Sequence, residues 1–250
     1  MELRFLGTGT STGVPQIGCG CRVCASSDTR DKRLRASAIL FTGKENILID
    51  AGPDLRTQLI RAGSPSLDAL LVTHSHFDHI GGLIDLRSYC YPDSFPIYCQ
   101  SDVEREVREF FPYCFVEDLY PGVPTFSFHT LRPYEPFSVG STRIVPLPVM
   151  HYKLQILGFR IGSLAYITDC KTMPQATIDA LKGVHTLVIN SLRIEPHMSH
   201  LSLAETLALI EKIKPRAAYL THMSHGMGIH SEVRLPEGVR LAYDGLSIEV

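Results

Sequence analysis

The sequence lacks any apolar run long enough to cross a bilayer, which argues against a membrane-spanning protein. Its first residues lack the basic segment, apolar stretch and small-residue cleavage site of a secretory signal, so we expect a cytoplasmic protein. The net charge of -2 offers no general electrostatic case for binding nucleic acid. Low-complexity linkers and short internal repeats are also missing. We therefore expect one domain that spans residues 1–250.

Short segments rich in β-branched and aromatic residues recur between glycine, proline and aspartate residues, which indicates strands. The predicted strands cover residues 3–6, 37–42, 46–49, 69–73, 96–99, 125–130, 142–149, 155–161, 164–168, 186–190, 217–221, 240–243 and 247–250. The predicted helices cover residues 54–62, 102–111, 174–182 and 202–214. Interspersed strands and helices favour an α/β layered architecture. Residues 89–96 and 122–136, rich in proline and aromatics, are interpreted as loops near an active-site mouth.

Three imidazoles and one carboxylate fall within six consecutive residues, from His74 to His79 in the segment HSHFDH. Neutral imidazole is a common ligand for borderline transition metals, and a carboxylate adds a hard anionic ligand. Four such groups cannot all reach one tetrahedral ion from so short a segment, so they would divide between two adjacent ions. The run is internal and follows a predicted buried strand, which argues against a tag or a solvated loop.

Further ligand-type residues follow other predicted strands. His151, Asp169 and His222 each come directly after an apolar strand-like segment. Strand ends hold side chains on a rigid scaffold, as a metal site requires. Each residue taken alone is more simply structural, but the repetition favours a shared site.

Together these residues resemble the metallo-β-lactamase fold hydrolases, and the segment LIDAG at residues 48–52 is similar to the first motif of that superfamily. The resemblance covers the chain from the first strand to the last. It implies an αββα sandwich of two mixed β-sheets flanked by helices, with the metals at one edge of the sheets. Asp50 would then support the metal-binding loop.

The same resemblance implies a division of the ligands between two ions. His74, His76 and His151 would hold one ion. Asp78, His79 and His222 would hold the other, and Asp169 would bridge both. Two such ions lower the pKa of bound water and clamp an in-line displacement, so attack by metal hydroxide on a phosphate ester is expected. The ligand types suit zinc, manganese or iron.

Seven cysteines, an odd number, are not expected to form disulfides in a reducing compartment. Cys19, Cys21 and Cys24 cluster in a glycine-rich loop, which suggests a structural zinc site that lacks one ligand. His225 would complete a three-cysteine, one-histidine tetrahedron, since it lies just past the strand that ends before His222. Three free thiols or a redox pair are the alternatives.

The cysteine loop narrows the resemblance to the phosphodiesterases associated with carbon–phosphorus lyase. Those enzymes act on phosphoribosyl 1,2-cyclic phosphate and carry a separate structural zinc. The segments GTGTSTGVP at 7–15, LTHMSH at 220–225 and YDG at 243–245 match their pattern. The first of these is either a tight turn or a loop whose backbone contacts substrate phosphate.

A leaving alkoxide needs a proton, and histidine suits that role near neutral pH. By resemblance to this branch and to tRNA 3′-processing enzymes, His200 aligns with a general-acid or phosphate-binding histidine. Asp78 is the second candidate for proton transfer while it binds metal.

The resulting hypothesis is a phosphodiesterase with two catalytic divalent ions and one structural zinc. Its expected partner is a small phosphodiester such as phosphoribosyl 1,2-cyclic phosphate; neither a membrane nor nucleic acid is expected, and a homodimer is left open. The alternative is a tRNA 3′-processing endonuclease, although the long Gly/Pro-rich arm that those enzymes use for tRNA is missing from the sequence.

Overall fold

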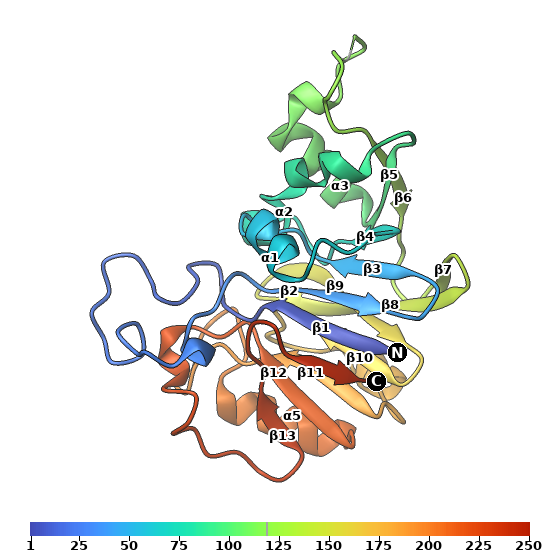
Figure 1. Cartoon of the computed structure of the whole chain (residues 1–250). Helices are drawn as coiled ribbons and strands as arrows, with labels where there is room; N and C mark the ends of the chain where they lie inside the picture. Colours follow the sequence, from blue (N-terminus) through green and yellow to red (C-terminus); the bar gives the residue numbers. More distant parts are fainter. Residues whose placement is uncertain (119) are drawn as a thin grey trace.

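The computed structural model describes residues 1–118 and 120–250, which form two seven-stranded sheets packed face to face (Figure 1). The first sheet has the order β14-β1-β2-β3-β4-β5-β6 and the second β13-β12-β11-β10-β9-β8-β7. The strands of the first sheet are β1 (Glu2–Gly7), β2 (Ser37–Phe41), β3 (Asn46–Ile49), β4 (Ala69–Leu71), β5 (Phe95–Cys99), β6 (Phe126–Thr130) and β14 (Ser247–Glu249). Those of the second are β7 (Phe137–Val139), β8 (Thr142–His151), β9 (Leu154–Ile161), β10 (Leu164–Ile167), β11 (Thr186–Asn190), β12 (Ala217–Thr221) and β13 (Val239–Leu241).

Helices cover the outer faces of both sheets. The α-helices are α1 (Leu55–Arg61), α2 (Phe77–Ile80), α3 (Ser101–Phe110), α4 (Gln175–Ala180) and α5 (Leu203–Ile213). The 3-10 helices are η1 (Thr29–Asp31), η2 (Leu83–Tyr89), η3 (Pro112–Cys114) and η4 (His225–Met227). No helix among the described residues has the length and apolarity needed to cross a membrane.

Three apolar layers hold the sandwich together. A central layer between the sheets includes Phe5, Ile49 and Tyr166. A second layer lies between the first sheet and α1, α3 and η2, and a third lies between the second sheet and α4 and α5. Helix, sheet, sheet and helix therefore follow in order, which confirms the predicted αββα fold.

Both sheets are mixed, and their parallel parts place the site. Strands β3 to β6 run parallel to one another, as do β10 to β13. Because the carboxyl ends of parallel strands meet at one edge of a sheet, residues that follow β3, β4, β10 and β12 come together there.

The predicted strands match observed strands, with ends that differ by one or two residues, but the sequence analysis missed several short elements. Strand β7 has only three residues and pairs with β8 at the edge of the second sheet. Helix α2 has four residues and begins inside the HSHFDH run. The interpretation of 122–136 as a loop is wrong for 126–130, which pair in register with β5 as β6 and confirm the strand predicted at 125–130. Strands β5 and β6, together with η2, α3 and η3, form a segment that protrudes from the sandwich (Figure 1).

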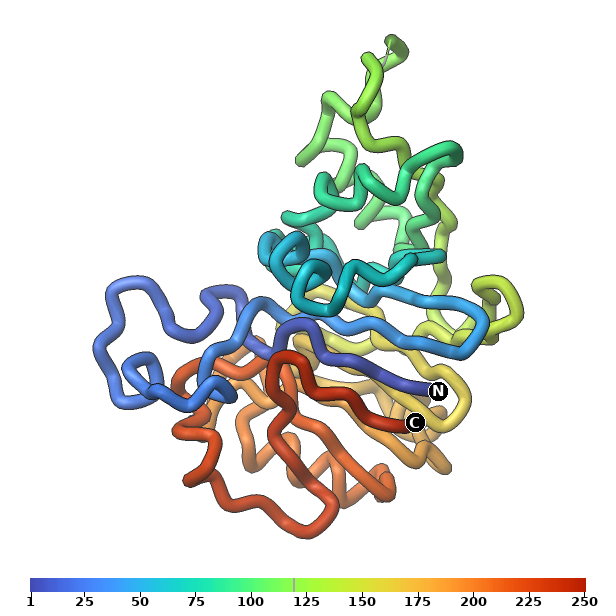
Figure 2. Tube along the Cα trace, in the orientation of Figure 1, coloured from blue at the N-terminus to red at the C-terminus, as the bar shows by residue number. Residues whose placement is uncertain are grey.

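The N-terminal segment after β1 leaves the sandwich and returns as a long loop, drawn in blue in Figure 2 beside the orange-red C-terminal part of the chain. Gly9 joins it to both Arg35 and Met223 through isolated bridges. A Cβ at Gly9 would come within 2.7 Å of the Arg33 carbonyl oxygen, so this close approach of backbones requires glycine.

Glu45 ties the two sheets together at the edge opposite the strand ends described above. It lies in the turn between β2 and β3, and its carboxylate accepts hydrogen bonds from Thr42 Oγ1 at 2.8 Å, Ser141 N at 2.7 Å and Thr142 Oγ1 at 2.7 Å. Ser141 belongs to the turn between β7 and β8 in the other sheet, and Thr142 is the first residue of β8. The backbone N–H of Ser141 and the two threonine hydroxyls lower the pKa of Glu45 to about 2.

This depressed pKa predicts an acid-sensitive contribution to stability. The free carboxyl has a pKa of about 4.3, so the ionised form stabilises the fold above that pH, and the contribution disappears between pH about 4.3 and about 2. Glu45→Gln should lower Tm at pH 7 by about 2–4 °C, and the gap to wild type should shrink below pH about 4.3 and close as the pH falls to about 2. Thermal unfolding followed by circular dichroism checks this, with Glu237→Gln as the control for charge removal. A gap that stays constant with pH would contradict the assignment.

Candidate metal centre

Three predicted site residues lie just past strand ends in an unusual backbone conformation. Asp50 directly follows β3 with φ 58°, and His222 directly follows β12 with φ 54°. Asp169 lies two residues past β10 with φ 56°. The left-handed region costs of order 1–3 kcal/mol for a residue other than glycine, and such strain is concentrated at functional sites. Here it turns each side chain from the strand direction into the space between the sheets' ends.

The predicted ligands gather in two sets. One ligand atom from each of His74, His76 and His151 lies within 4.8 Å of the others. The same holds for the second set, Asp78, His79, Asp169 and His222. Asp169 lies between the sets, since its Oδ2 is 3.8 Å from His74 Nε2 and 3.2 Å from His222 Nε2. The structure thus brings together all seven residues predicted from the sequence; their role as ligands stays a prediction.

Hydrogen bonds fix the orientation of three of the imidazoles. His79 Nδ1 bonds Asp50 Oδ2 at 2.8 Å, and His151 Nδ1 bonds the Ser199 carbonyl oxygen at 2.9 Å. His74 Nδ1 lies 3.0 Å from Thr73 Oγ1. Metal-binding histidines characteristically use one ring nitrogen for the ion and donate the other N–H to the protein. Nε2 is therefore the nitrogen left for an ion in each of these rings.

The buried atoms of this cluster fit bound cations. Nε2 of His74 and of His79 are buried and, within residues 1–118 and 120–250, without a hydrogen-bond partner. A buried polar atom that stays unpaired is costly. The carboxylates of Asp78 and Asp169 lie 3.2 and 3.4 Å from His79 Nε2, and buried charge needs compensation. Unpaired imidazole nitrogens facing several carboxylates are the donor set that divalent transition metals prefer.

The electrostatics of the cluster point the same way. Burial works against ionisation of Asp169, but His222 and His79 hold its pKa well below the usual range. Burial likewise opposes a charge on His79, yet Asp169, Asp50 and Asp78 raise its pKa well above the usual range. The carboxylates thus favour positive charge at this place, and a divalent ion would supply it.

His200 completes a third set with His151 and Asp169. Its Nε2 lies 3.2 Å from Asp169 Oδ2, and its Nδ1 lies 3.0 Å from Ser199 Oγ. Burial lowers the pKa of His200, while the hydrogen bond to Asp169 opposes that shift. His200 therefore lies against the carboxylate that joins the two ligand sets, where the sequence analysis expected a proton donor.

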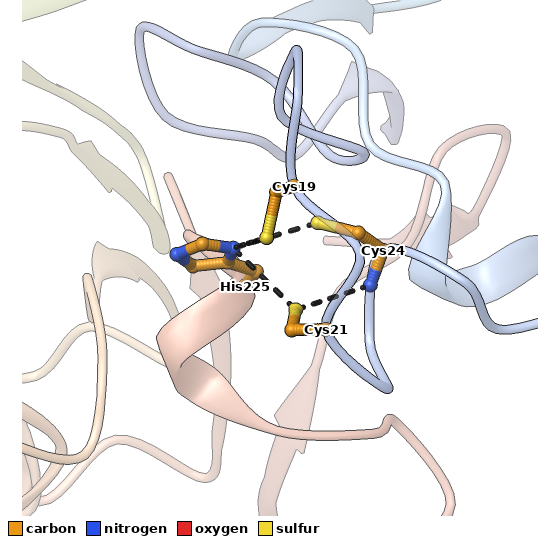
Figure 3. A group of neighbouring side chains, drawn as sticks. All are labelled: Cys19, Cys21, Cys24 and His225. Atoms are coloured by element: carbon orange, nitrogen blue, oxygen red, sulfur yellow. Dashed lines mark hydrogen bonds between the residues drawn. The ribbon is translucent and has the colours of Figure 1, made fainter.

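The second predicted site is built from the N-terminal loop and the residues after β12 (Figure 3). His225 Nδ1 lies 3.3 Å from Cys19 Sγ, 3.6 Å from Cys21 Sγ and 3.4 Å from Cys24 Sγ. Zn–S bonds of about 2.3 Å and Zn–N bonds of about 2.0–2.1 Å at tetrahedral angles imply N···S separations of about 3.5 Å. The backbone N–H of Cys24 lowers the pKa of Cys21 to about 6, which favours the thiolate that a metal requires. The four residues fit a closed structural zinc site.

Two supporting contacts escaped the sequence analysis. Ser75, inside the metal-binding run, donates a hydrogen bond to Glu106 of α3. Asp244 accepts hydrogen bonds from the backbone N–H groups of Thr8 and Leu34, at 2.9 and 2.7 Å. Helical spacing places Glu106 beside the apolar stripe of α3 but carries no signal of a contact 31 residues away. For Asp244, the YDG segment was the available signal, although its contacts depend on the tertiary fold.

The sequence and the fold of this chain match those of known proteins. Residues 45–223 match the family model described as the beta-lactamase superfamily domain. A protein of Porphyromonas gingivalis named octanoyltransferase is 42% identical over 98% of this chain and 51% of its own length. The chain thus spans about half the length of that relative. The crystal structure of a new diphosphatase from the PhnP family is similar to this chain, with 38% sequence identity. The match covers 100% of this chain and 97% of the diphosphatase chain, with a TM-score of 0.92.

The chain therefore belongs to the beta-lactamase superfamily and, within it, to the PhnP family. This confirms the family resemblance drawn from the motifs. Human tRNase Z, short form, covers 100% of this chain and 99% of its own with a TM-score of 0.76. At 17% identity, that likeness shows the shared fold alone.

The cysteine site predicts a third metal ion. Cys21→Ser should remove about one equivalent of zinc per chain and lower Tm, because the closed tetrahedron loses a thiolate. Metal analysis by mass spectrometry and thermal unfolding check this. Cys90→Ser serves as the control, because Cys90 is a half-buried cysteine at the end of η2 and does not belong to this site. Wild-type protein that binds only two ions per chain would contradict the third site.

Proposed function

We propose that the protein is a metal-dependent phosphodiesterase that hydrolyses a small cyclic phosphodiester such as phosphoribosyl 1,2-cyclic phosphate. The observation that carries the proposal is the position of His200, whose Nε2 lies 3.2 Å from Asp169, the residue shared by the two ligand sets. A phosphodiester centred on the cluster would have its leaving oxygen within reach of this imidazole. The relative named as a diphosphatase also acts on a phosphoryl group, as its name states, which supports this reaction class.

The residues of the cluster would hold two divalent ions, zinc, manganese or iron. Such ions neutralise charge on phosphoryl oxygens and lower the pKa of a bound water to roughly 7. His74, His76 and His151 would hold one ion, Asp78, His79 and His222 the other, and Asp169 would contact both. The hydrogen bonds from Nδ1 to Asp50, Thr73 and Ser199 orient three of these imidazoles before substrate arrives, which is the preorganisation that catalysis needs.

His200 would hold a proton at Nε2 and deliver it to the leaving oxygen. The carboxylate of Asp169 stabilises the protonated imidazole, and burial favours its return to the neutral form after the transfer. Asp78 is suited to accepting rather than donating. Although burial opposes its charge, His79 and His222 keep its pKa well below the usual range, so the group stays a carboxylate.

Neither octanoyl transfer nor tRNA processing is part of this proposal. The octanoyltransferase name belongs to a relative about twice the length of this chain, and half of that relative lies outside the match. The net charge of -2 offers little attraction for tRNA. Tight binding and cleavage of precursor tRNA in a gel-shift and cleavage assay would overturn the choice of a small substrate.

Substitution of His76 tests the dinuclear cluster. His76→Ala should lower hydrolysis of bis(4-nitrophenyl) phosphate by more than about 100-fold, because even the loss of groups that only orient metal ligands costs about 10–100-fold. Metal content should fall in parallel. His185→Ala, on the exposed surface before β11, is the matched control. Activity retained by His76→Ala would contradict the mechanism.

Substitution of His200 tests the proton donor. His200→Ala should lower kcat by about 10²–10⁴-fold for a phosphodiester with an alkoxide leaving group, which needs a proton. The loss should be much smaller when the leaving group is 4-nitrophenolate, which departs without protonation. Steady-state kinetics on the two substrates give the comparison. Equal losses would remove His200 as the acid and leave it a role in binding phosphate.

A further inference from the structure

The loop between β11 and α5, residues 191–202, is anchored beside the ligand cluster. The backbone N–H of Leu192 donates to the Leu201 carbonyl oxygen at 2.9 Å, and the N–H of Leu201 donates to that of Cys170 at 2.9 Å. Both leucines are buried, and Cys170 directly follows Asp169 in the chain. The loop is therefore tied to the carboxylate that the two ligand sets share.

Within this loop, one serine contacts two histidines of the centre. The carbonyl oxygen of Ser199 accepts a hydrogen bond from His151 Nδ1 at 2.9 Å, and Ser199 Oγ lies 3.0 Å from His200 Nδ1. The other nitrogen of His200, Nε2, lies 3.2 Å from Asp169 Oδ2. An ionised carboxylate only accepts hydrogen bonds, so the proton of this last contact belongs to Nε2. Ser199 thus contacts the one nitrogen of His200 that faces away from the cluster.

The half-buried His197 fixes the direction of the Ser199 hydroxyl. His197 Nδ1 accepts the backbone N–H of Ser199 at 3.3 Å and lies 3.2 Å from Ser199 Oγ. Burial and the Arg193 guanidinium lower the pKa of His197, so its ring is neutral near pH 7 and Nδ1 keeps a lone pair for these bonds. The hydroxyl donates to this lone pair and turns its own lone pairs towards His200 Nδ1. His197 Nδ1 also lies 3.4 Å from His200 Nδ1, which places a further acceptor on the same side of that ring.

We propose that Ser199 and His197 are positioning residues for His200: they keep a hydrogen on its Nδ1 and leave Nε2 as the nitrogen that faces the ligand cluster. This inference rests on the proposed function and deepens it, because it assigns the nitrogen through which His200 transfers its proton. An acid–base histidine is characteristically oriented by a group bonded to its second ring nitrogen. Without that bond, the neutral ring of His200 would carry its hydrogen on either nitrogen.

Ser199→Ala tests the first contact, because it removes the hydroxyl and keeps the carbonyl that His151 uses. It should lower kcat for phosphoribosyl 1,2-cyclic phosphate by about 10–100-fold, the effect of one hydrogen bond to a charged group, and leave KM and metal content unchanged. The loss on bis(4-nitrophenyl) phosphate should be much smaller, because 4-nitrophenolate departs without a proton. Ser199→Thr retains Oγ and should restore kcat. Met198→Ala, at an exposed position of the same loop, is the matched control and should match wild type.

Variants of His197 test the second contact. His197→Ala should lower kcat for the same cyclic substrate by about two- to tenfold, the effect of one neutral hydrogen bond. His197→Asn should restore it, because the amide oxygen offers an acceptor near the place of Nδ1. The effects of Ser199→Ala and His197→Ala should vanish in a His200→Ala background, where neither residue has a ring left to position. Losses that persist in that background, or that are equal on the two substrates, would overturn the inference.

A spectroscopic measurement separates this inference from the hydrolytic function. Nitrogen NMR of zinc-loaded protein labelled at histidine should show a hydrogen on His200 Nδ1, with the signal identified by its loss in His200→Ala. Ser199→Ala should abolish the Nδ1–H signal, and Ser199→Thr should retain it. If wild type hydrolyses neither substrate, the proposed function fails and NMR alone decides the inference. A neutral His200 with its hydrogen on Nε2 in wild type would overturn it.

Discussion

The hydrogen bonds of the Asp50 carboxylate are the interaction on which the rest of the centre depends. Asp50 is fully buried at the end of β3, where it accepts from Thr73 N at 2.8 Å and lies 2.8 Å from His79 Nδ1. Thr73 belongs to the segment that follows β4, and His79 belongs to α2. One carboxylate thus joins both ends of the HSHFDH run to the neighbouring strand β3. Without it, His79 Nδ1 and the backbone N–H of Thr73 would lose their buried hydrogen-bond partner.

Backbone strain and buried charge balance one another in this centre. The left-handed conformations of Asp50, Asp169 and His222 disfavour folding, and so does the burial of several carboxylates. Both become tolerable where hydrogen bonds and opposite charges converge on one place. The sandwich supplies that place, because β3 and β4 in one sheet end next to β10 and β12 in the other. The three apolar layers stabilise the sandwich as a whole, so that the strained backbone and the buried carboxylates at its edge are tolerated.

The clustering of the candidate ligands was predictable from the sequence because their chemistry and their position at the ends of apolar strands carry the signal together. His151, Asp169 and His222 each lie at or just past the end of a strand with clear β-propensity, and the family resemblance placed them at one edge of the sheets. Other parts gave no such signal. Helix α2 is one turn long, and β7 is three residues long. Both are too short for a periodic pattern of apolar residues to reveal them in the sequence. The contacts of Glu45 and Glu106 join residues far apart in the chain and exist only after the sheets and α3 have packed.

The two candidate metal sites share one short segment of the chain, residues 222–225. His222 and His225 lie three residues apart after β12, and Met223 between them exchanges backbone hydrogen bonds with Thr8 and Thr10. An ion held by the cysteines and His225 would therefore fasten the N-terminal loop to the same short segment that aims His222 at Asp78 and Asp169. Asp244 also stabilises this loop, because its carboxylate accepts hydrogen bonds from the backbone N–H and the hydroxyl of Thr8. With that ion in place, the cysteine loop would stabilise the direction of the His222 side chain, which links these distant residues to the cluster at the HSHFDH run.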